Sequence, residues 1–382
     1  MEKLTSKLYM EKLSLAYTGI GSLPFSGNSA PNDANDFVFK TCKDFPYWPQ
    51  LPHYKMEEHM TLQFTEKFAG LSFDKRLHRF YLDDKKDDFL KNLSVLSDDF
   101  NKVISSNSIF ECEEILNKYN LIPPYSNTFS LFLNTIQNLN DKPNFIKGTI
   151  TGPFTFLGNF CDAKGKPALF NKTFIEIISK FLTLKALFQI KEFKKAAKDC
   201  VPVIFIDEPG LSQIHSYPYS EIAKDKITEM LKIISDNIKK FDAITGIHCC
   251  GCTDWDIVFE SGTDIINFDA YFYTENLAQY TEKIEKFLQN GGYLAFGIIP
   301  TLDKEALLGL DKDKLYEKFQ NSVEILSDKI DKNLILKQCF ITPSCGLGSL
   351  DINLANHVLN LTKELSQTLR NQTFKKENEV TL

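Results

Sequence analysis

Short apolar runs that each end in small or polar residues recur along the chain, and they predict eight strands. The runs lie at 17–22, 47–51, 145–151, 201–207, 243–248, 264–269, 293–298 and 339–342. Amphipathic stretches between most of these runs predict helices at 171–199, 219–241, 277–289 and 304–326. Strands that alternate with helices predict an α/β fold with a parallel sheet, and eight such units predict a (β/α)8 TIM barrel. An open, doubly wound sheet is the alternative fold.

The stretch 52–143, between the second and third predicted strands, is too long for a simple connection. Its pattern predicts a hairpin at 71–82 and helices at 84–105 and 109–119. We interpret it as an elaboration inserted over the mouth of the barrel. Residues 1–370 then form a single catalytic domain, and the polar stretch 371–382 is expected to be a disordered tail.

The composition is that of a globular protein with a large core, since 43% of the 382 residues are hydrophobic and 25% are charged. The net charge of -6 and the lack of a long basic block argue against a nucleic-acid partner. No apolar run is long enough for a membrane span or a secretory signal, so we expect a cytoplasmic protein. In that compartment clustered cysteines indicate metal or thiol chemistry rather than disulfides.

Candidate chemistry begins at the end of the fifth predicted strand, in the sequence Gly-Ile-His-Cys-Cys-Gly-Cys. Side chains alternate along an extended backbone, so His248 and Cys250 point to the same side. One imidazole nitrogen and one thiolate are ligands that zinc prefers. The alternative is a buried thiol cluster beside a hydrogen-bonded histidine.

A third ligand is expected from Cys345, which lies among Pro343, Gly346 and Gly348 after the eighth predicted strand. Such neighbours fix an unusual backbone path, which suits a side chain that must be aimed. Asp269 ends the sixth strand and is a candidate fourth ligand. Its alternatives are a helix cap or a hydrogen-bond partner of His248, and Cys252 competes for the fourth position because it shares the parity of His248 and Cys250.

Two adjacent carboxylates, Asp207 and Glu208, end the fourth predicted strand. They point to opposite faces, so we expect one to hold a substrate ammonium and the other to pair with the protein. The first strand ends in a Gly-Ile-Gly-Ser turn, whose glycines let backbone amides approach a ligand. The second strand ends at Gln50, which lies between two prolines.

Taken in order, these motifs resemble the catalytic, C-terminal barrel of cobalamin-independent methionine synthases, in its short single-barrel form. The resemblance extends over nearly the whole predicted barrel, and the motifs that carry it are Ile20-Gly21-Ser22, Thr151-Gly152-Pro153, Ile206-Asp207-Glu208-Pro209, His248-x-Cys250 and Pro343-x-Cys345-Gly346-Leu347.

The resemblance implies that His248, Cys250 and Cys345 bind Zn2+, with Asp269 as a further ligand where the family usually has Glu. It also implies that Ser22 and the backbone of Ile20 and Gly21 hold the carboxylate of homocysteine, and that Asp207 holds its ammonium. A second acidic contact of the family has no clear counterpart here. Gln50 is the nearest candidate, and Glu57 is another.

The implied reaction is the methylation of homocysteine to methionine, with the thiol activated as a zinc thiolate at neutral pH. The methyl donor is either a methylcorrinoid protein or methyltetrahydrofolate. Gln213 replaces an acid that contacts folate in the family, and an expected aromatic residue is replaced near Asn159, so both positions weaken the folate interpretation.

Three other functions are open. A corrinoid-linked methyltransferase could act on another small thiol such as coenzyme M, but Asp207 favours an amino-acid thiol. A decarboxylase of the uroporphyrinogen type would need more than the three arginines of this chain. A non-catalytic zinc module would have four protein ligands and no open position.

Overall fold

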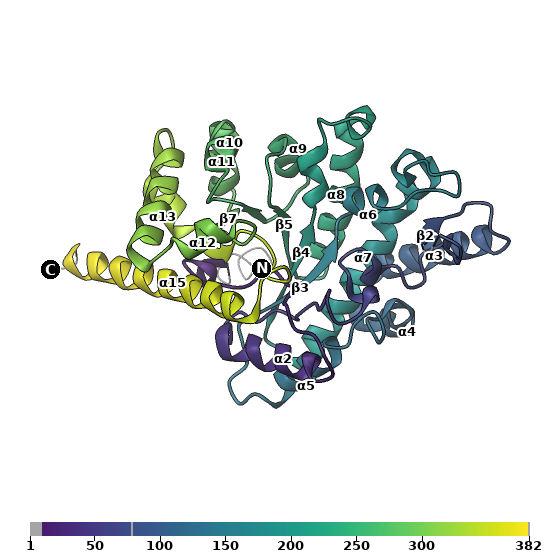
Figure 1. Ribbon diagram of the computed structural model, residues 1–382, viewed down its shortest axis with the longest axis horizontal. Coiled ribbons are helices and arrows are strands. Elements are labelled where there is room, and N and C mark those ends of the chain that lie inside the picture. Colours follow the sequence, from purple (N-terminus) through teal and green to yellow (C-terminus); the bar gives the residue numbers. More distant parts are fainter. Residues whose placement is uncertain (1–9, 78, 381–382) are drawn as a thin grey trace.

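The centre of the molecule is a curled, parallel sheet of six strands in the order β3-β4-β5-β6-β7-β8, with helices on its outer side (Figure 1). The computed structural model describes residues 10–77 and 79–380. The strands are β3 (Phe145–Thr151), β4 (Val201–Asp207), β5 (Ile244–Cys249), β6 (Ile265–Phe268), β7 (Tyr293–Ile299) and β8 (Cys339–Pro343). Each pairs in parallel with the next strand in sequence, which places all six carboxyl ends at one rim.

Both faces of the sheet are buried, which is why the strands read as continuous apolar runs. One core cluster gathers the side chains of alternate strand positions on the inner face, and it includes Phe145, Val203, Phe205, Ile244, Ile265, Tyr293, Ala295 and Phe340. The intervening side chains pack against the helices in a second, larger cluster. Inner-face positions nearer the rim carry Asp207, His248 and Asn267, so the same alternation that fills the core places polar groups at the rim.

The two segments before β3 make single bridges instead of regular strands. Tyr17 bridges to Ile341 of β8, Tyr47 bridges to Lys147 of β3, and Ser22 bridges to Gln50 between them. Isolated bridges therefore replace the regular strands that we expected at 17–22 and 47–51. Gly19 and Gly21 interrupt the first segment, and Pro49, which has no N–H group to donate, interrupts the second.

The helices between strands follow the expected pattern with shifted ends. Those around the sheet are α6 (Pro153–Gly158), α7 (Lys172–Ala196), α8 (Lys224–Lys240), α9 (Trp255–Glu260), α10 (Thr274–Ala278), α11 (Thr281–Gln289), α12 (Lys304–Leu308), α13 (Lys312–Ser327), α14 (Lys332–Lys337) and α15 (Ile352–Val380), with 3-10 turns at Ala168–Phe170, Pro209–Gln213 and Tyr219–Glu221. The helix expected at 304–326 is divided, because Asp311 accepts a hydrogen bond from the Lys314 N–H group at 2.9 Å and starts a new helix. The helix α15 contains residues 371–380, which we expected to form a tail.

The long connection before β3 contains the predicted hairpin, β1 (Leu71–Asp74) paired with β2 (Arg79–Leu82). Its helices and 3-10 turns are Met56–Glu58, Leu62–Phe64, α3 (Phe89–Ser105), Ile109–Cys112, α4 (Glu113–Leu116), Asn117–Tyr119 and α5 (Phe129–Asn138); α2 (Ala30–Thr41) and a turn at Glu11–Leu13 precede it. This segment reaches the rim at Met60, whose carbonyl accepts a hydrogen bond from Thr151 Oγ1. No helix in the described part of the chain is both long and apolar enough to cross a membrane.

Candidate metal centre

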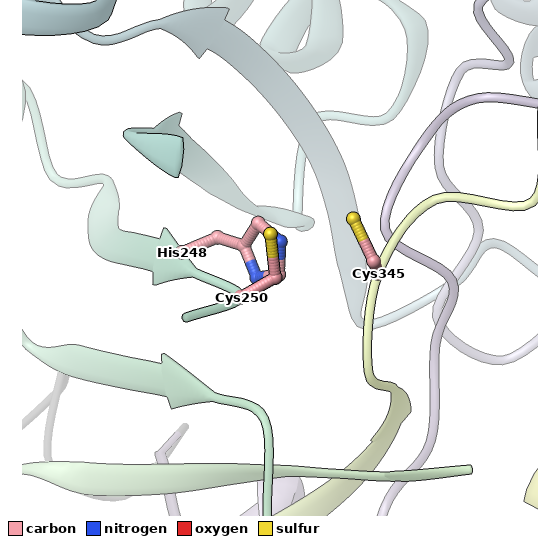
Figure 2. Close-up of side chains that lie close together, drawn as sticks. All are labelled: His248, Cys250 and Cys345. Atoms are coloured by element: carbon pink, nitrogen blue, oxygen red, sulfur yellow. The ribbon is translucent and has the colours of Figure 1, made fainter. Parts of the chain in front are cut away.

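Three side chains converge at the rim of the sheet: His248 in β5, Cys250 just after β5, and Cys345 just after β8 (Figure 2). Their ligand atoms all lie within 4.8 Å of one another, and this is the one group of potential metal ligands found among the described residues. His248 is buried, whereas the two cysteines are half-buried. The structure therefore brings together residues that are almost 100 positions apart in the sequence.

The imidazole of His248 is held by Asn267, which lies beside it in the register of β5 and β6. Asn267 Nδ2 donates to Ala295 O and to Thr342 Oγ1, both at 2.9 Å, so its Oδ1 must face the histidine. This oxygen lies 2.6 Å from His248 Nδ1, which therefore carries the proton. Nε2 is left buried without a hydrogen-bond partner, and its lone pair is available to a metal.

The electrostatics of the group favour a bound cation. A hydrogen bond from the Cys345 thiol, together with the nearby His248, lowers the pKa of Cys250 despite burial. Burial lowers the pKa of His248, but Cys250, Asp207 and Asn267 outweigh burial and raise it. The anionic sulfur of Cys250 and the lone pair on His248 Nε2 lie close together and away from water, so one bound cation would stabilise both.

The donor set fits zinc. Zinc takes nitrogen and sulfur ligands in a tetrahedral arrangement, and sites that react with substrates keep three protein ligands and one open position. His248, Cys250 and Cys345 supply one nitrogen and two sulfurs. The hydrogen-bonded Nδ1 of His248 fixes the ring orientation, as is usual for a ligating histidine.

Asp269 and Cys252 lie outside this group of three. Asp269 Oδ1 accepts hydrogen bonds from the N–H groups of Tyr271 and Phe272, at 3.0 and 2.9 Å, so it caps the turn that follows β6. Burial raises the pKa of this carboxyl to about 6. Cys252 is exposed. The capping alternative for Asp269 is thus observed, and the Asp side chain is short enough to bond its own following backbone.

Asp207 lies at the inner face next to His248, its partner in the register of β4 and β5. Thr149 Oγ1 donates a hydrogen bond to Oδ2 of Asp207. The other oxygen, Oδ1, is buried without a partner. Burial raises the pKa of Asp207, and the nearby Lys147 and His248 partly offset this shift. The carboxylate is therefore suited to receive a cationic group from a ligand.

Glu208 points away from Asp207 and holds the start of α6. Its Oε1 accepts from the Phe154 N–H group at 2.9 Å, and its Oε2 accepts from the N–H and hydroxyl groups of Thr155 at 2.8 and 2.6 Å. A Cβ atom at Gly152 would lie 2.1 Å from the Glu208 carboxyl carbon, so the turn between β3 and α6 requires glycine. The two acids have different partners, as their opposite parity predicted.

The Ile20-Gly21-Ser22 turn contacts the loop that carries Cys345. Ser22 Oγ accepts a hydrogen bond from the Gly348 N–H group at 3.2 Å, and Ser22 O accepts from the Leu347 N–H group at 2.9 Å. A Cβ atom at Gly346 would lie 2.1 Å from Ser22 Oγ, so a larger residue after Cys345 would displace the Ser22 hydroxyl group. The turn therefore packs against the loop that carries Cys345.

Gln50 and Glu57 occupy different environments. Gln50 is buried, bridges to Ser22, and donates from Nε2 to Gln63 Oε1 at 2.7 Å. Glu57 lies in the 3-10 turn Met56–Glu58 and is half-buried. Of the two candidates for the missing acidic contact, Gln50 is the one beside the turn.

Sequence reasoning missed Asn267 and Lys147. Asn267 has the same parity as Asp269 and lies opposite His248, so alternation along β6 was the available signal. Lys147 is the third residue of β3 and is 1% exposed, with its Nζ donating to Ile20 O. A charged residue in the middle of a buried strand was the signal there.

A pocket of about 550 Å³ opens beside Cys250. Its lining comprises Met60, Phe154, Thr155, Gly158, Asn159, Pro209, Gly210, Ser212, Gln213, Tyr219, Cys250, Gly251, Cys252, Tyr273 and Leu302. No Asp, Glu, His, Lys or Arg is among these described lining residues, which include the thiol groups of Cys250 and Cys252. Asn159 and Gln213, the two positions where the sequence departs from a folate-binding pattern, both lie in this wall.

The comparison with solved structures finds a similar fold. A B12-independent methionine synthase from Shewanella sp. W3-18-1, solved in complex with selenomethionine, matches with a TM-score of 0.54 at 14% identity. The match covers 95% of this chain and 99% of that chain. The likeness shows a shared fold.

Two glycoside hydrolases match less well. A GH113 beta-1,4-mannanase has a TM-score of 0.41 at 12% identity, covering 94% of this chain and 97% of that chain. A broad-specificity endoglucanase from Clostridium longisporum has a TM-score of 0.28 at 12% identity, covering 66% and 90%. These scores are too low to indicate a function. No family model and no curated protein matches the sequence.

Proposed function

We propose that this protein is a zinc-dependent methyltransferase of the cobalamin-independent methionine synthase type, which methylates homocysteine to methionine. The observation that carries the proposal is the group of His248, Cys250 and Cys345, in which Nε2 of His248 is buried and unpartnered. The fold shared with a B12-independent methionine synthase supports the same assignment. In this proposal the bridged segments before β3 complete a barrel with the six strands.

His248, Cys250 and Cys345 would hold the zinc ion. When bound, zinc keeps a thiol deprotonated at neutral pH, where a free thiol of pKa about 8.5 is mostly protonated. Asn267 holds the His248 ring in the tautomer that leaves Nε2 free. Three protein ligands leave one position for a substrate sulfur.

The remaining polar groups fit the amino-acid end of homocysteine. Asp207 Oδ1 is buried and unpartnered, and it accepts the substrate ammonium. The Ile20-Gly21-Ser22 turn contacts the Cys345 loop and holds the substrate carboxylate. A substrate held at both ends of its amino-acid part presents its sulfur to the metal ligands with a fixed geometry.

The methyl donor approaches through the pocket beside Cys250. Besides the cysteines, its lining offers amide and hydroxyl groups from Asn159, Gln213, Thr155 and Ser212, and aromatic faces from Phe154, Tyr219 and Tyr273. We propose a methylcorrinoid protein as donor, with methyltetrahydrofolate as the alternative. Folate-binding members of the family have an acid at the position of Gln213, so the pocket lacks the carboxylate that would contact the folate ring.

A methyltransferase that acts on another small thiol is the second candidate. It would share the metal ligands but would not need Asp207. The unpartnered Oδ1 of Asp207 favours a substrate with an ammonium group.

A methyl-transfer assay tests the proposal. Zinc-loaded protein is given L-homocysteine or coenzyme M, with methylfolate, methylcobalamin or a methylated corrinoid protein as donor. We expect methionine from L-homocysteine and no product from the Cys250→Ser variant. Transfer to coenzyme M alone would favour the second candidate, and the absence of transfer to either thiol with all three donors would contradict the proposal.

A further inference from the structure

Lys147 is a charged residue in the interior of the sheet that neither the metal centre nor the core requires. It lies on the inner face of β3 and is 1% exposed. Alternate positions on the same strand carry Phe145 and Thr149; on the neighbouring strand Val203 pairs with Lys147, and Phe205 pairs with Thr149. Burying an ammonium group is costly unless compensating groups surround it, so such a residue normally has a specific role.

The surroundings of the Lys147 ammonium identify this role. Nζ donates a hydrogen bond to Ile20 O, the carbonyl at the start of the Ile20-Gly21-Ser22 turn. It also lies 4.4 Å from the centre of the Phe205 ring, which adds a cation–π contact. Asp207 is two residues after Phe205 on the same face of β4, and its negative charge interacts with the ammonium. Lys147 thus donates to the turn and lies on the same inner face as Asp207.

These two neighbours are the groups assigned above to the two ends of an amino acid. Gly21 and Ser22 are placed to hold the carboxylate, and Asp207 Oδ1 is placed to hold the ammonium. An amino acid presents a carboxylate and an ammonium group next to each other. Its binding site therefore needs hydrogen-bond donors or positive charge for the carboxylate and a negative charge for the ammonium. Lys147 orients the peptide group after Ile20 by its hydrogen bond and provides a fixed positive charge next to Asp207.

We propose that Lys147 is a positioning residue for the amino-acid end of the substrate, which holds the Ile20-Gly21-Ser22 turn and Asp207 on either side of one subsite. This inference rests on the proposed function. It adds a determinant of specificity: the protein selects zwitterionic amino-acid thiols over simple thiols through a residue that does not ligate the metal.

The test compares Lys147→Met with Lys185→Met. Lys185 is a matched control because it is also 1% exposed and also donates to a backbone carbonyl, Asn120 O at 3.1 Å, but it lies on α7 away from the rim. Circular dichroism and thermal melting establish that each variant is folded. Lys147→Gln is measured in parallel, since it keeps a hydrogen-bond donor at the position if the methionine variant does not fold.

Binding is measured by calorimetry with three probes. L-Homocysteine and 1-propanethiol are titrated into zinc-loaded protein, and L-methionine, which has the amino-acid end but no free thiol, is titrated into protein without zinc. We expect both Lys147 variants to bind the two amino acids at least about tenfold more weakly than the unmodified protein, with 1-propanethiol unaffected. The Lys185→Met protein is expected to bind all three probes as the unmodified protein does.

Two results would overturn this inference and leave the proposed function intact. One is unchanged binding of both amino acids by the Lys147 variants. The other is an equal loss for L-homocysteine and 1-propanethiol, which would make Lys147 a support of the metal centre. A failure of the unmodified protein to bind L-homocysteine is a different outcome, because it contradicts the proposed function and the amino-acid subsite together.

Discussion

His248 Nδ1 lies 2.6 Å from Asn267 Oδ1, and this contact decides which nitrogen of the histidine can bind a metal. The amide of Asn267 cannot turn around, because its Nδ2 already donates to Ala295 O and Thr342 Oγ1. The orientation of one asparagine on β6 therefore fixes the tautomer of a ligand on β5.

Replacing this asparagine should weaken metal binding. In Asn267→Ala, the His248 ring loses its orienting partner, and we expect the affinity for zinc to fall by about 10- to 100-fold. Competition with a chromophoric chelator measures this change. Asn276→Ala is the control, since Asn276 accepts a hydrogen bond from Trp255 Nε1 at 2.8 Å outside the metal centre. Equal affinities in Asn267→Ala and the unmodified protein would show that the contact does not act on the metal.

The cysteines should differ sharply in their effect on zinc content. Cys345→Ser removes one of the two sulfur ligands, and we expect it to abolish most zinc binding at stoichiometric loading. Cys252→Ser should retain a full equivalent, because Cys252 is exposed and outside the group of three. Elemental analysis of the dialysed proteins gives both values. Loss of zinc in Cys252→Ser with retention in Cys345→Ser would exchange their roles.

Asp207 should discriminate between thiols with and without an ammonium group. In Asp207→Asn we expect the affinity for L-homocysteine to fall by at least about tenfold, because the substrate ammonium loses its buried charge partner. The affinity for 4-mercaptobutyrate, which lacks only the amino group, should change little. Calorimetry with zinc-loaded protein measures both. Asp99→Asn is a control, since Asp99 pairs with Lys118 in the long connection before β3. A parallel loss for the two thiols would contradict the ammonium assignment.

The buried Lys185 should make stability depend on pH in the alkaline range. Burial lowers the pKa of Lys185 from 10.5 to about 8, and Glu66 offsets this only in part. Between these two values the unfolded chain binds more protons than the folded chain, so stability rises with pH. Relative to Lys185→Met, the unmodified protein should gain about 3 kcal/mol from pH 8 to pH 10.5. Urea unfolding across this range measures the difference, and a gain that falls with rising pH would contradict it.

Alternation along strands explains how much of the site could be predicted from sequence. It placed His248 and Cys250 on one side, and the parallel order of the strands brought Cys345 to the same rim. The same rule could have found Asn267, which faces His248 in the register of β5 and β6. The role of Asp269 was harder to predict, because a cap depends on the two N–H groups that follow it.

The fold was predicted well where strands are buried on both faces. The six strands from β3 to β8 form regular apolar runs, and the structure pairs them in sequence order. The two segments before β3 form only single bridges, because backbone interruption by glycine and proline outweighs their apolar pattern. The positions of helix breaks depend on caps such as Asp303, which accepts from the Ala306 N–H group at 2.9 Å.

The zinc centre and its open position can be measured directly by X-ray absorption at the zinc edge, with and without L-homocysteine. The protein alone should show one nitrogen and two sulfur ligands, with a light atom in the fourth position. On addition of L-homocysteine we predict a third sulfur at about 2.3 Å in place of the light atom. An unchanged sulfur count, or four protein ligands before the thiol is added, would contradict the account.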